Sequence, residues 1–383
     1  DAGTVAGDVA FSGFESLQGG SDTDTFVFDD GVVFGGTVDG GAGTNALDYS
    51  AWTSAVTVDL DQDTATGTGG ATNFDNATGG SAADQLTGNA STNLLIGGAG
   101  DDVLSGGDGN DVLDGGLDDD NLDGGEGDDN LAGGGGDDSL TGAAGDDTLS
   151  DGSGDDTLEG GEDDDEYRLT PGSTDLVTDT GGDDRLNFAG AAAGITLDID
   201  ATTLQAATAT GNLQLTGVFE DVTGSGFDDS FSADSLGSGR TIDGGAGADT
   251  LTADNVANSW NITGSDAGTV AGDVAFSGFE SLRGGSDTDT FGFDDGVVFG
   301  GTVDGGSGTN ALDYSAWTTA VTVDLSQGTA TGTAGATNFD NATGGAGANQ
   351  LTGDAGANLL TGGVGADVLT GGDGADTLAG GDG

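Results

Sequence analysis

Glycine and aspartate recur in residues 79–168 at a spacing that can hold a metal ion. The segment divides into ten consecutive nonapeptides of the pattern G-G-x-G-x-D-x-U-x, where U is a large apolar residue, mostly leucine. Two of them, GGAGDDVLS and GGDGNDVLD, fill residues 97–114. Glycine at positions 1, 2 and 4 permits backbone angles at which several carbonyl oxygens point to one centre, and the aspartate at position 6 adds a carboxylate. A centre lined only by oxygen is typical of calcium rather than of a transition metal.

Position 6 therefore supplies the candidate calcium ligands. Four further nonapeptides occupy residues 344–379, and shorter glycine-rich phrases keep the same sixth position. The candidates are seventeen aspartates: Asp24, Asp84, Asp102, Asp111, Asp120, Asp129, Asp138, Asp147, Asp156, Asp165, Asp175, Asp184, Asp229, Asp249, Asp289, Asp367 and Asp376. In five turns asparagine replaces aspartate at position 6, which weakens or removes the calcium site there. These residues are Asn45, Asn93, Asn310, Asn349 and Asn358.

The composition excludes several other classes of protein. The 383 residues carry a formal net charge of −65 with only four basic side chains, so we expect no nucleic-acid partner. No apolar run approaches the roughly 20 residues that membrane insertion needs. Without cysteine or histidine there is no catalytic triad and no thiolate or imidazole metal site. Acid pairs such as Asp101 and Asp102 belong to a periodic lattice with no singular cleft, so we predict that the chain is not an enzyme.

The nonapeptide predicts a turn over its first six residues and a very short strand over its last three. The apolar side chain at position 8 then points inward and its two neighbours point outward. Two nonapeptides make one coil, and the turns of successive coils stack and share ions. Alternating stretches such as AVTVDL (55–60) also predict strands, and no segment predicts a helix. One leucine in each nonapeptide buries too little apolar area to offset chain entropy, so we expect folding and calcium binding to be one event.

The chain also repeats on a longer scale. Residues 266–383 match residues 1–118 without a gap and are identical at 96 of 118 positions. We therefore expect a window on a longer tandem array of 265-residue units. The expected division is a solenoid with wider coils over 1–78, the nonapeptide roll over 79–168, wider coils again over 169–265, a second copy of 1–78 over 266–343, and a second copy of the start of the roll over 344–383.

The nonapeptides resemble the RTX (repeats-in-toxin) calcium-binding family. That resemblance implies an all-β fold, a right-handed parallel β-roll or β-solenoid that binds several Ca²⁺ ions. Residues 166–188 also resemble the segment that follows such rolls in secreted proteins of the serralysin type. By that likeness Tyr167 packs at the end of the roll, and Asp175, Asp179 and Asp184 ligate calcium. The resemblance further implies type I secretion and an extracellular or cell-surface location.

Three functions agree with these observations. The first is structural: a calcium-rigidified rod, filament or surface-layer material built from tandem units, whose open solenoid ends favour self-association into a filament or lattice. The alternatives are the stalk of a large RTX adhesin and the calcium-folding tail of a secreted enzyme or toxin. A carbohydrate partner rests only on Tyr49 and Trp52, repeated at Tyr314 and Trp317, and we expect these rings to pack inside a wider coil instead.

Overall fold

The computed structural model describes residues 2–5, 9–209, 211–232, 239–272 and 274–383. In these residues the chain forms strands and no helix, so none of their segments is a helix that could cross a membrane. The chain divides into two compact units, described separately below. The first holds residues 1–186 and 209–218, and the second holds residues 187–208 and 219–383. The prediction of an all-β fold is confirmed.

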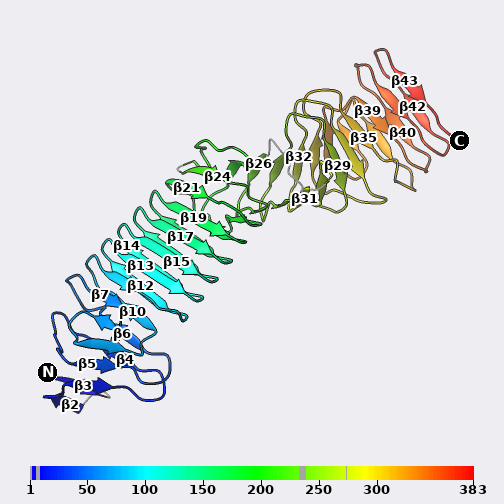
Figure 1. The fold of residues 1–383 in the computed structure, drawn as a ribbon. Coiled ribbons are helices and arrows are strands. Elements are labelled where there is room, and N and C mark those ends of the chain that lie inside the picture. The colour runs from blue at the N-terminus through cyan, green and yellow to red at the C-terminus, as the bar shows by residue number, and fades with distance from the viewer. Residues whose placement is uncertain (1, 6–8, 210, 233–238, 273) are drawn as a thin grey trace. The chain divides into compact units, whose positions relative to one another are not determined.

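In the first unit the nonapeptides build a roll of two parallel sheets (Figure 1). Each strand pairs with the strand two places along the chain, so that Leu95 lies beside Leu113 and Leu104 beside Leu122. Each shift equals two nonapeptides, which confirms the predicted length of a coil. The strands of the roll are β10 (Asn76–Thr78), β11 (Gln85–Thr87), β12 (Leu94–Ala99), β13 (Val103–Asp108), β14 (Val112–Leu117), β15 (Asn121–Glu126), β16 (Asn130–Gly135), β17 (Ser139–Ala144), β18 (Thr148–Ser153), β19 (Thr157–Glu162) and β20 (Glu166–Arg168).

Most strands of the roll are longer than the pattern predicts. From β12 to β19 each strand has six residues, because it continues through the first three positions of the following nonapeptide. Gly98 and Gly116 pair in the ladder although their φ angles are +113° and +112°. Glycine has no Cβ and tolerates this conformation without strain. The expected six-residue turn is therefore wrong, and the turn proper is only positions 4–6.

The core of the roll is a single column of leucines from each sheet. Position 8 points inward as predicted, and its side chains are buried to 1 % exposure or less: Leu86, Leu95, Leu104, Leu113, Leu122, Leu131, Leu140, Leu149 and Leu158. The neighbouring positions 7 and 9 face outward and carry polar side chains in most coils, as alternation along a strand requires. Tyr167 takes the same inward place in β20 and is fully buried. The core is thus one side chain wide.

The remaining strands of the first unit form wider coils. Phe26 pairs with Leu47 and Leu47 with Ala77. The residues that face each other in these coils are 21 and 30 residues apart, instead of 18 in the roll. Tyr49 stacks on Phe28 with ring centroids 4.7 Å apart and is fully buried, which agrees with packing and leaves its ring no open face for a sugar. These strands are β1 (Ala2–Val5), β2 (Val9–Ser12), β3 (Ser16–Gln18), β4 (Thr25–Val27), β5 (Thr37–Asp39), β6 (Ala46–Asp48), β7 (Thr57–Asp59), β8 (Thr64–Ala65), β9 (Gly70–Thr72), β21 (Thr174–Thr178) and β24 (Asn212–Thr216).

The second unit repeats the registers of the first. Phe291 pairs with Leu312 and Leu312 with Ala342. The facing residues of these coils are again 21 and 30 residues apart. The long sequence repeat is therefore also a structural repeat. The strands are β23 (Thr196–Asp198), β25 (Asp221–Thr223), β26 (Ser230–Ser232), β27 (Thr241–Asp243), β28 (Thr250–Thr252), β29 (Ser259–Ile262), β30 (Gly268–Val270), β31 (Val274–Ser277), β32 (Ser281–Arg283), β33 (Thr290–Phe293), β34 (Thr302–Asp304), β35 (Ala311–Asp313), β36 (Thr322–Asp324), β37 (Thr329–Ala330), β38 (Gly335–Thr337), β39 (Asn341–Thr343), β40 (Gln350–Thr352), β41 (Leu359–Thr361), β42 (Val368–Thr370) and β43 (Thr377–Ala379).

The parallel pairing has local exceptions. Strand β22 (Arg185–Asn187) lies where the chain passes between the units. Antiparallel pairs join β1 to β2, β7 to β8, β29 to β30, β30 to β31 and β36 to β37. Each joins strands that are neighbours along the chain, where a short connection brings the chain back on itself. The fold is therefore a mostly parallel β-roll with hairpin insertions.

Replacing Leu131 by alanine tests how much of the stability rests on the leucine column. We expect the free energy of unfolding in saturating calcium to fall by about 2–5 kcal/mol, because a fully buried leucine leaves a cavity in a core one side chain wide. Urea unfolding followed by circular dichroism measures this. The outward neighbour Asn130→Ala is the control and should change the unfolding free energy by less than about 0.5 kcal/mol. Equal losses in the two variants would contradict the inward–outward assignment.

Candidate metal centre

The sixth residue of each nonapeptide lies in the turn between two strands, with its side chain inside the coil. Asp102, Asp111 and Asp129 are each 3 % exposed or less. One carboxylate oxygen, Oδ1, accepts a hydrogen bond from the main-chain N–H of the sixth residue one coil earlier. Asp120 Oδ1, for example, accepts from the Asp102 nitrogen at 2.8 Å. Through these hydrogen bonds the carboxylates join each coil to the preceding one.

Because two nonapeptides make a coil, alternate aspartates form two separate ladders. The first ladder has N–O distances of 2.6–3.2 Å and joins Asp84, Asp102, Asp120, Asp138, Asp156 and Asp175. The second has distances of 2.6–3.0 Å and joins Asn93, Asp111, Asp129, Asp147, Asp165 and Asp184. Every predicted ligand of the roll therefore lies in one of two rows.

In most of these aspartates the other carboxylate oxygen, Oδ2, is buried and faces no donor, whereas Asp84 Oδ2 accepts from the Gly80 nitrogen at 2.5 Å. Within the described part of the chain no hydrogen-bond donor reaches Oδ2 of Asp102, Asp111, Asp120, Asp129, Asp138, Asp147, Asp165, Asp249 and Asp367. A buried oxygen with a negative charge and no partner is costly, because it has lost its water and gained nothing in return. Because a buried carboxylate oxygen without a partner recurs at regular intervals along the roll, it indicates a bound cation at each such turn.

Position 1 shows what else lines the space around Oδ2. A Cβ atom added to Gly97 would collide with Asp102 Oδ2 and with the carbonyl oxygen of Gly115 in the next coil. Gly106 would meet Asp111 Oδ2 and the carbonyl oxygen of Gly124 in the same way. A carboxylate oxygen and a main-chain carbonyl oxygen thus converge on one small space in successive coils. Alanine at position 1 would fill it, which explains the need for glycine there.

Burial raises the pKa of these carboxyl groups. Loss of water is the largest cause, and the pKa is raised to about 7 at Asp102, Asp120, Asp129, Asp156 and Asp165. Neighbouring carboxylates in the ladder raise it further, and the main-chain N–H that Oδ1 accepts lowers it in part. Without a cation the roll therefore favours protonated carboxyl groups up to neutral pH.

These residues fit calcium. The donor set is made of carboxylate and main-chain carbonyl oxygens, which hard divalent cations prefer, and it contains no nitrogen or sulfur ligand. A bound Ca²⁺ would supply positive charge to Oδ2 and to the carbonyl oxygens of two successive coils. The chain's own contribution is to hold these oxygens in register through the Oδ1 ladder.

The candidates outside the main roll vary in burial. Asp229, Asp249 and Asp289 are buried to 2 % exposure or less. Asp229 Oδ1 accepts from the Ile195 nitrogen at 2.6 Å, and Asp249 Oδ1 accepts from the Asp229 nitrogen at 2.7 Å. The remaining candidates Asp24, Asp367 and Asp376 are only half-buried.

The wider coils contain ladder residues that the nonapeptide pattern missed. Glu280 Oε2 accepts from the Asp249 nitrogen at 2.9 Å, and Asp75 Oδ2 accepts from the Asn45 nitrogen at 2.8 Å. Asp340 repeats the role of Asp75 in the second copy. All three are acids that directly follow a phenylalanine in phrases such as GFES and NFDN. The recurrence of that Phe-acid pair is the signal that identifies them.

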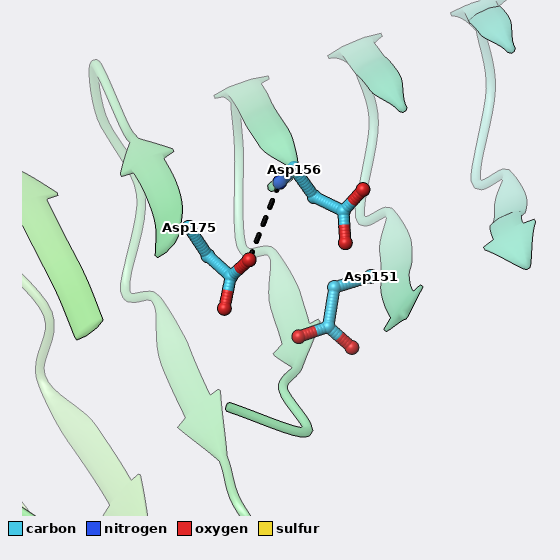
Figure 2. A group of neighbouring side chains, drawn as sticks. All are labelled: Asp151, Asp156 and Asp175. Carbon is cyan, nitrogen blue, oxygen red and sulfur yellow. Dashed lines mark hydrogen bonds between the residues drawn. The ribbon is translucent and has the colours of Figure 1, made fainter. Parts of the chain in front are cut away.

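Two groups of three carboxylates mark the end of the roll. Asp151, Asp156 and Asp175 have ligand atoms within 4.8 Å of one another, and so have Asp165, Asp179 and Asp184. Figure 2 shows the first group, in which the Asp156 nitrogen donates to Asp175 Oδ1 at 3.2 Å. The likeness to serralysin-type segments predicts Asp175, Asp179 and Asp184 as calcium ligands. The structure places Asp175 in the first group and Asp179 and Asp184 in the second.

Asp151 is a member of the first group that the pattern missed. It occupies position 1 of the nonapeptide DGSGDDTLE, where the others of the roll carry glycine. Its side chain is buried, and it accepts hydrogen bonds from the Thr170 main chain and hydroxyl. The sequence signal for this third carboxylate is an acidic residue at position 1, where the other nonapeptides of the roll have the glycine that lies beside Oδ2.

Tyr167 belongs to the second group. Its hydroxyl lies 2.9 Å from Asp179 Oδ1 and accepts from the Gly160 nitrogen at 2.8 Å. Tyr167 is fully buried at the end of the leucine column. This position agrees with the packing role that the likeness implies, and it holds Asp179 close to Asp165.

Comparison with protein families agrees with this geometry. Residues 69–169, 241–258 and 334–383 match the family model of the RTX calcium-binding nonapeptide repeat. These parts of the chain are RTX calcium-binding nonapeptide repeats. RTX repeats bind calcium, so the carboxylate rows are those of a calcium-binding repetitive protein. No curated protein matches the chain.

The raised pKa values predict how the calcium-free RTX roll depends on pH. An aspartate in the unfolded chain has a pKa near 3.9, and the folded roll raises it to about 7 at Asp129. The folded state therefore binds protons more tightly, and this contribution to stability is fully present below a pH of about 4 and lost as the pH rises through about 7. Circular dichroism of calcium-stripped protein at pH 4.5 and 7.5 measures it, and we expect more strand signal at pH 4.5. More strand signal at pH 7.5 would contradict the burial of these groups.

Replacing Asp129 by alanine tests a single turn of the roll. The change removes the acceptor of the Asp111 nitrogen and the oxygen Oδ2. We expect the chain to bind at least one calcium ion fewer and its free energy of unfolding in calcium to fall by about 2–4 kcal/mol. Equilibrium dialysis and urea unfolding measure the two effects. Asp123→Ala, on the exposed face of β15, removes the same charge and should change neither quantity.

Proposed function

We propose that this chain is a calcium-dependent structural repeat protein that works as a rod, filament or surface-layer material outside the cell. The two rows of buried carboxylates carry the proposal, because one orphaned oxygen recurs in coil after coil. At neutral pH such a roll is stable only where a cation reaches the turns that hold an orphaned carboxylate oxygen. The chain then gains a stiff stack of coils in which each coil contacts its two neighbours.

The same property supports a location outside the cell. RTX repeat proteins are typically secreted, and we propose export by type I secretion before folding. Millimolar calcium is enough for sites of weak affinity, whereas the calcium of the cytosol is not. With a net charge of −65 the chain repels itself in the absence of calcium, which keeps it unfolded during export. The proposal assigns no catalytic step to the chain.

Electron microscopy of the purified chain, in millimolar calcium and in chelator, tests the proposal. We expect long filaments in calcium only, because the end faces exist only when the coils are folded. Single short rods in calcium would argue against assembly and favour the stalk of an adhesin. Identical particles in both conditions would contradict the role of calcium itself.

A further inference from the structure

Asparagine replaces the sixth-position aspartate in five turns, and its amide makes a bond that no carboxylate can make. All five asparagines are buried to 3 % exposure or less. Each donates from Nδ2 to a main-chain carbonyl oxygen of a neighbouring coil at 2.6–3.1 Å. The pairs are Asn45 to Asn73, Asn93 to Asp75, Asn310 to Asn338, Asn349 to Gly362 and Asn358 to Asp340.

Asn349 shows the arrangement most fully. Its Nδ2 lies within 2.8–3.3 Å of four oxygens: the carbonyls of Gly345, Gly347 and Gly362, and Asp367 Oδ1. An amide nitrogen has only two hydrogens, so it cannot donate a full hydrogen bond to all four oxygens. The four oxygens nevertheless surround it, as oxygens surround a small cation. Meanwhile Oδ1 keeps its place in the ladder and accepts from the Val321 nitrogen at 3.0 Å.

The first copy of the unit contains the matched turn with an aspartate. Asp84 corresponds to Asn349, and its Oδ1 accepts from the Val56 nitrogen at 2.7 Å. The flanking strands have the same sequence, QLT, and the same registers, because β11 pairs with β7 and β40 pairs with β36. The carbonyl oxygen of Gly97 and Asp84 Oδ2 lie beside the same glycine, Gly79. Asp84 Oδ2 also accepts from the Gly80 nitrogen at 2.5 Å. This turn therefore holds a charged carboxylate beside the Gly97 carbonyl oxygen, where Asn349 places a neutral amide nitrogen that donates to the Gly362 carbonyl oxygen.

We infer that the residue at position 6 decides which turns of the array require a cation. An asparagine amide takes the place that the ion has beside an aspartate, so these turns close without calcium and bind none. This inference rests on the calcium binding of the proposed function only for the aspartate turns. The array is thus a mixture: calcium-requiring turns from Asp102 to Asp165, and metal-free turns at Asn45 and Asn93 before them, repeated at Asn310 and Asn358.

Hydrogen exchange in chelator tests the metal-free turns. We expect the amides of residues 344–352 to exchange about tenfold more slowly than those of residues 79–87, because the Asn349 amide donates to the carbonyl oxygen of the next coil whereas the charged Asp84 carboxylate cannot. The Asn349→Asp variant should lose that protection in chelator and regain it in calcium. Asp84→Asn should give residues 79–87 new protection in chelator. Asn349→Ala has neither the donor nor the charge, so calcium should not restore its protection.

Calcium counting provides the second readout. Equilibrium dialysis should find one more bound ion per chain for Asn349→Asp and one fewer for Asp84→Asn. An Asn349→Asp variant that keeps its protection in chelator and gains no ion would overturn the inference. Failure of the proposed function looks different: the wild-type chain would bind no calcium at all, and the chelator comparison between Asn349 and its aspartate variant would still decide the role of the amide.

Discussion

The structure depends on one electrostatic constraint, which is that oxygen faces oxygen in the turns of the roll. Asp102 Oδ2 and the Gly115 carbonyl oxygen line one space, and within the described residues no donor reaches that carboxylate oxygen. In most proteins such a contact is removed by a different side chain. Here it repeats in coil after coil, so the roll is built to be completed by cations. The glycines, the short turns and the narrow core are all consequences of keeping those oxygens together.

The Oδ1 ladder explains how a narrow core, with one leucine column from each sheet, can hold its register. Each aspartate carboxylate bonds the main chain of the preceding coil, so an ion bound at one turn stabilises the contact between two coils. Loss of an ion then weakens its neighbours along the same row, and coils fold or open together. Two rows, one at each side of the roll, prevent a coil from tilting. The register is thus set by polar contacts as much as by burial of leucine.

Much of this was predictable from spacing alone. The coil of two nonapeptides, the inward leucines and the burial of the sixth-position aspartates follow from a short period with one apolar position. The strand lengths did not, because glycines such as Gly98 pair in the ladder at positive φ. Glu280 and Asp75 were missed because wider coils place them at shifts of 31 and 30 residues, where no short period marks them. Asp151 was missed because its partner Asp175 lies beyond the last nonapeptide.

A single atom type separates the two kinds of turn in this array. Asparagine and aspartate have nearly the same shape, and both keep Oδ1 in the ladder, as Asn349 and Asp84 show. Exchanging an oxygen for an NH₂ group changes the turn from one that needs a cation to one that supplies its own donors. The backbone, the strand registers and the leucine column need no adjustment. Calcium dependence can therefore be placed turn by turn along a solenoid without altering its fold, so that one repeated scaffold can hold both metal-free turns and turns that form only with calcium.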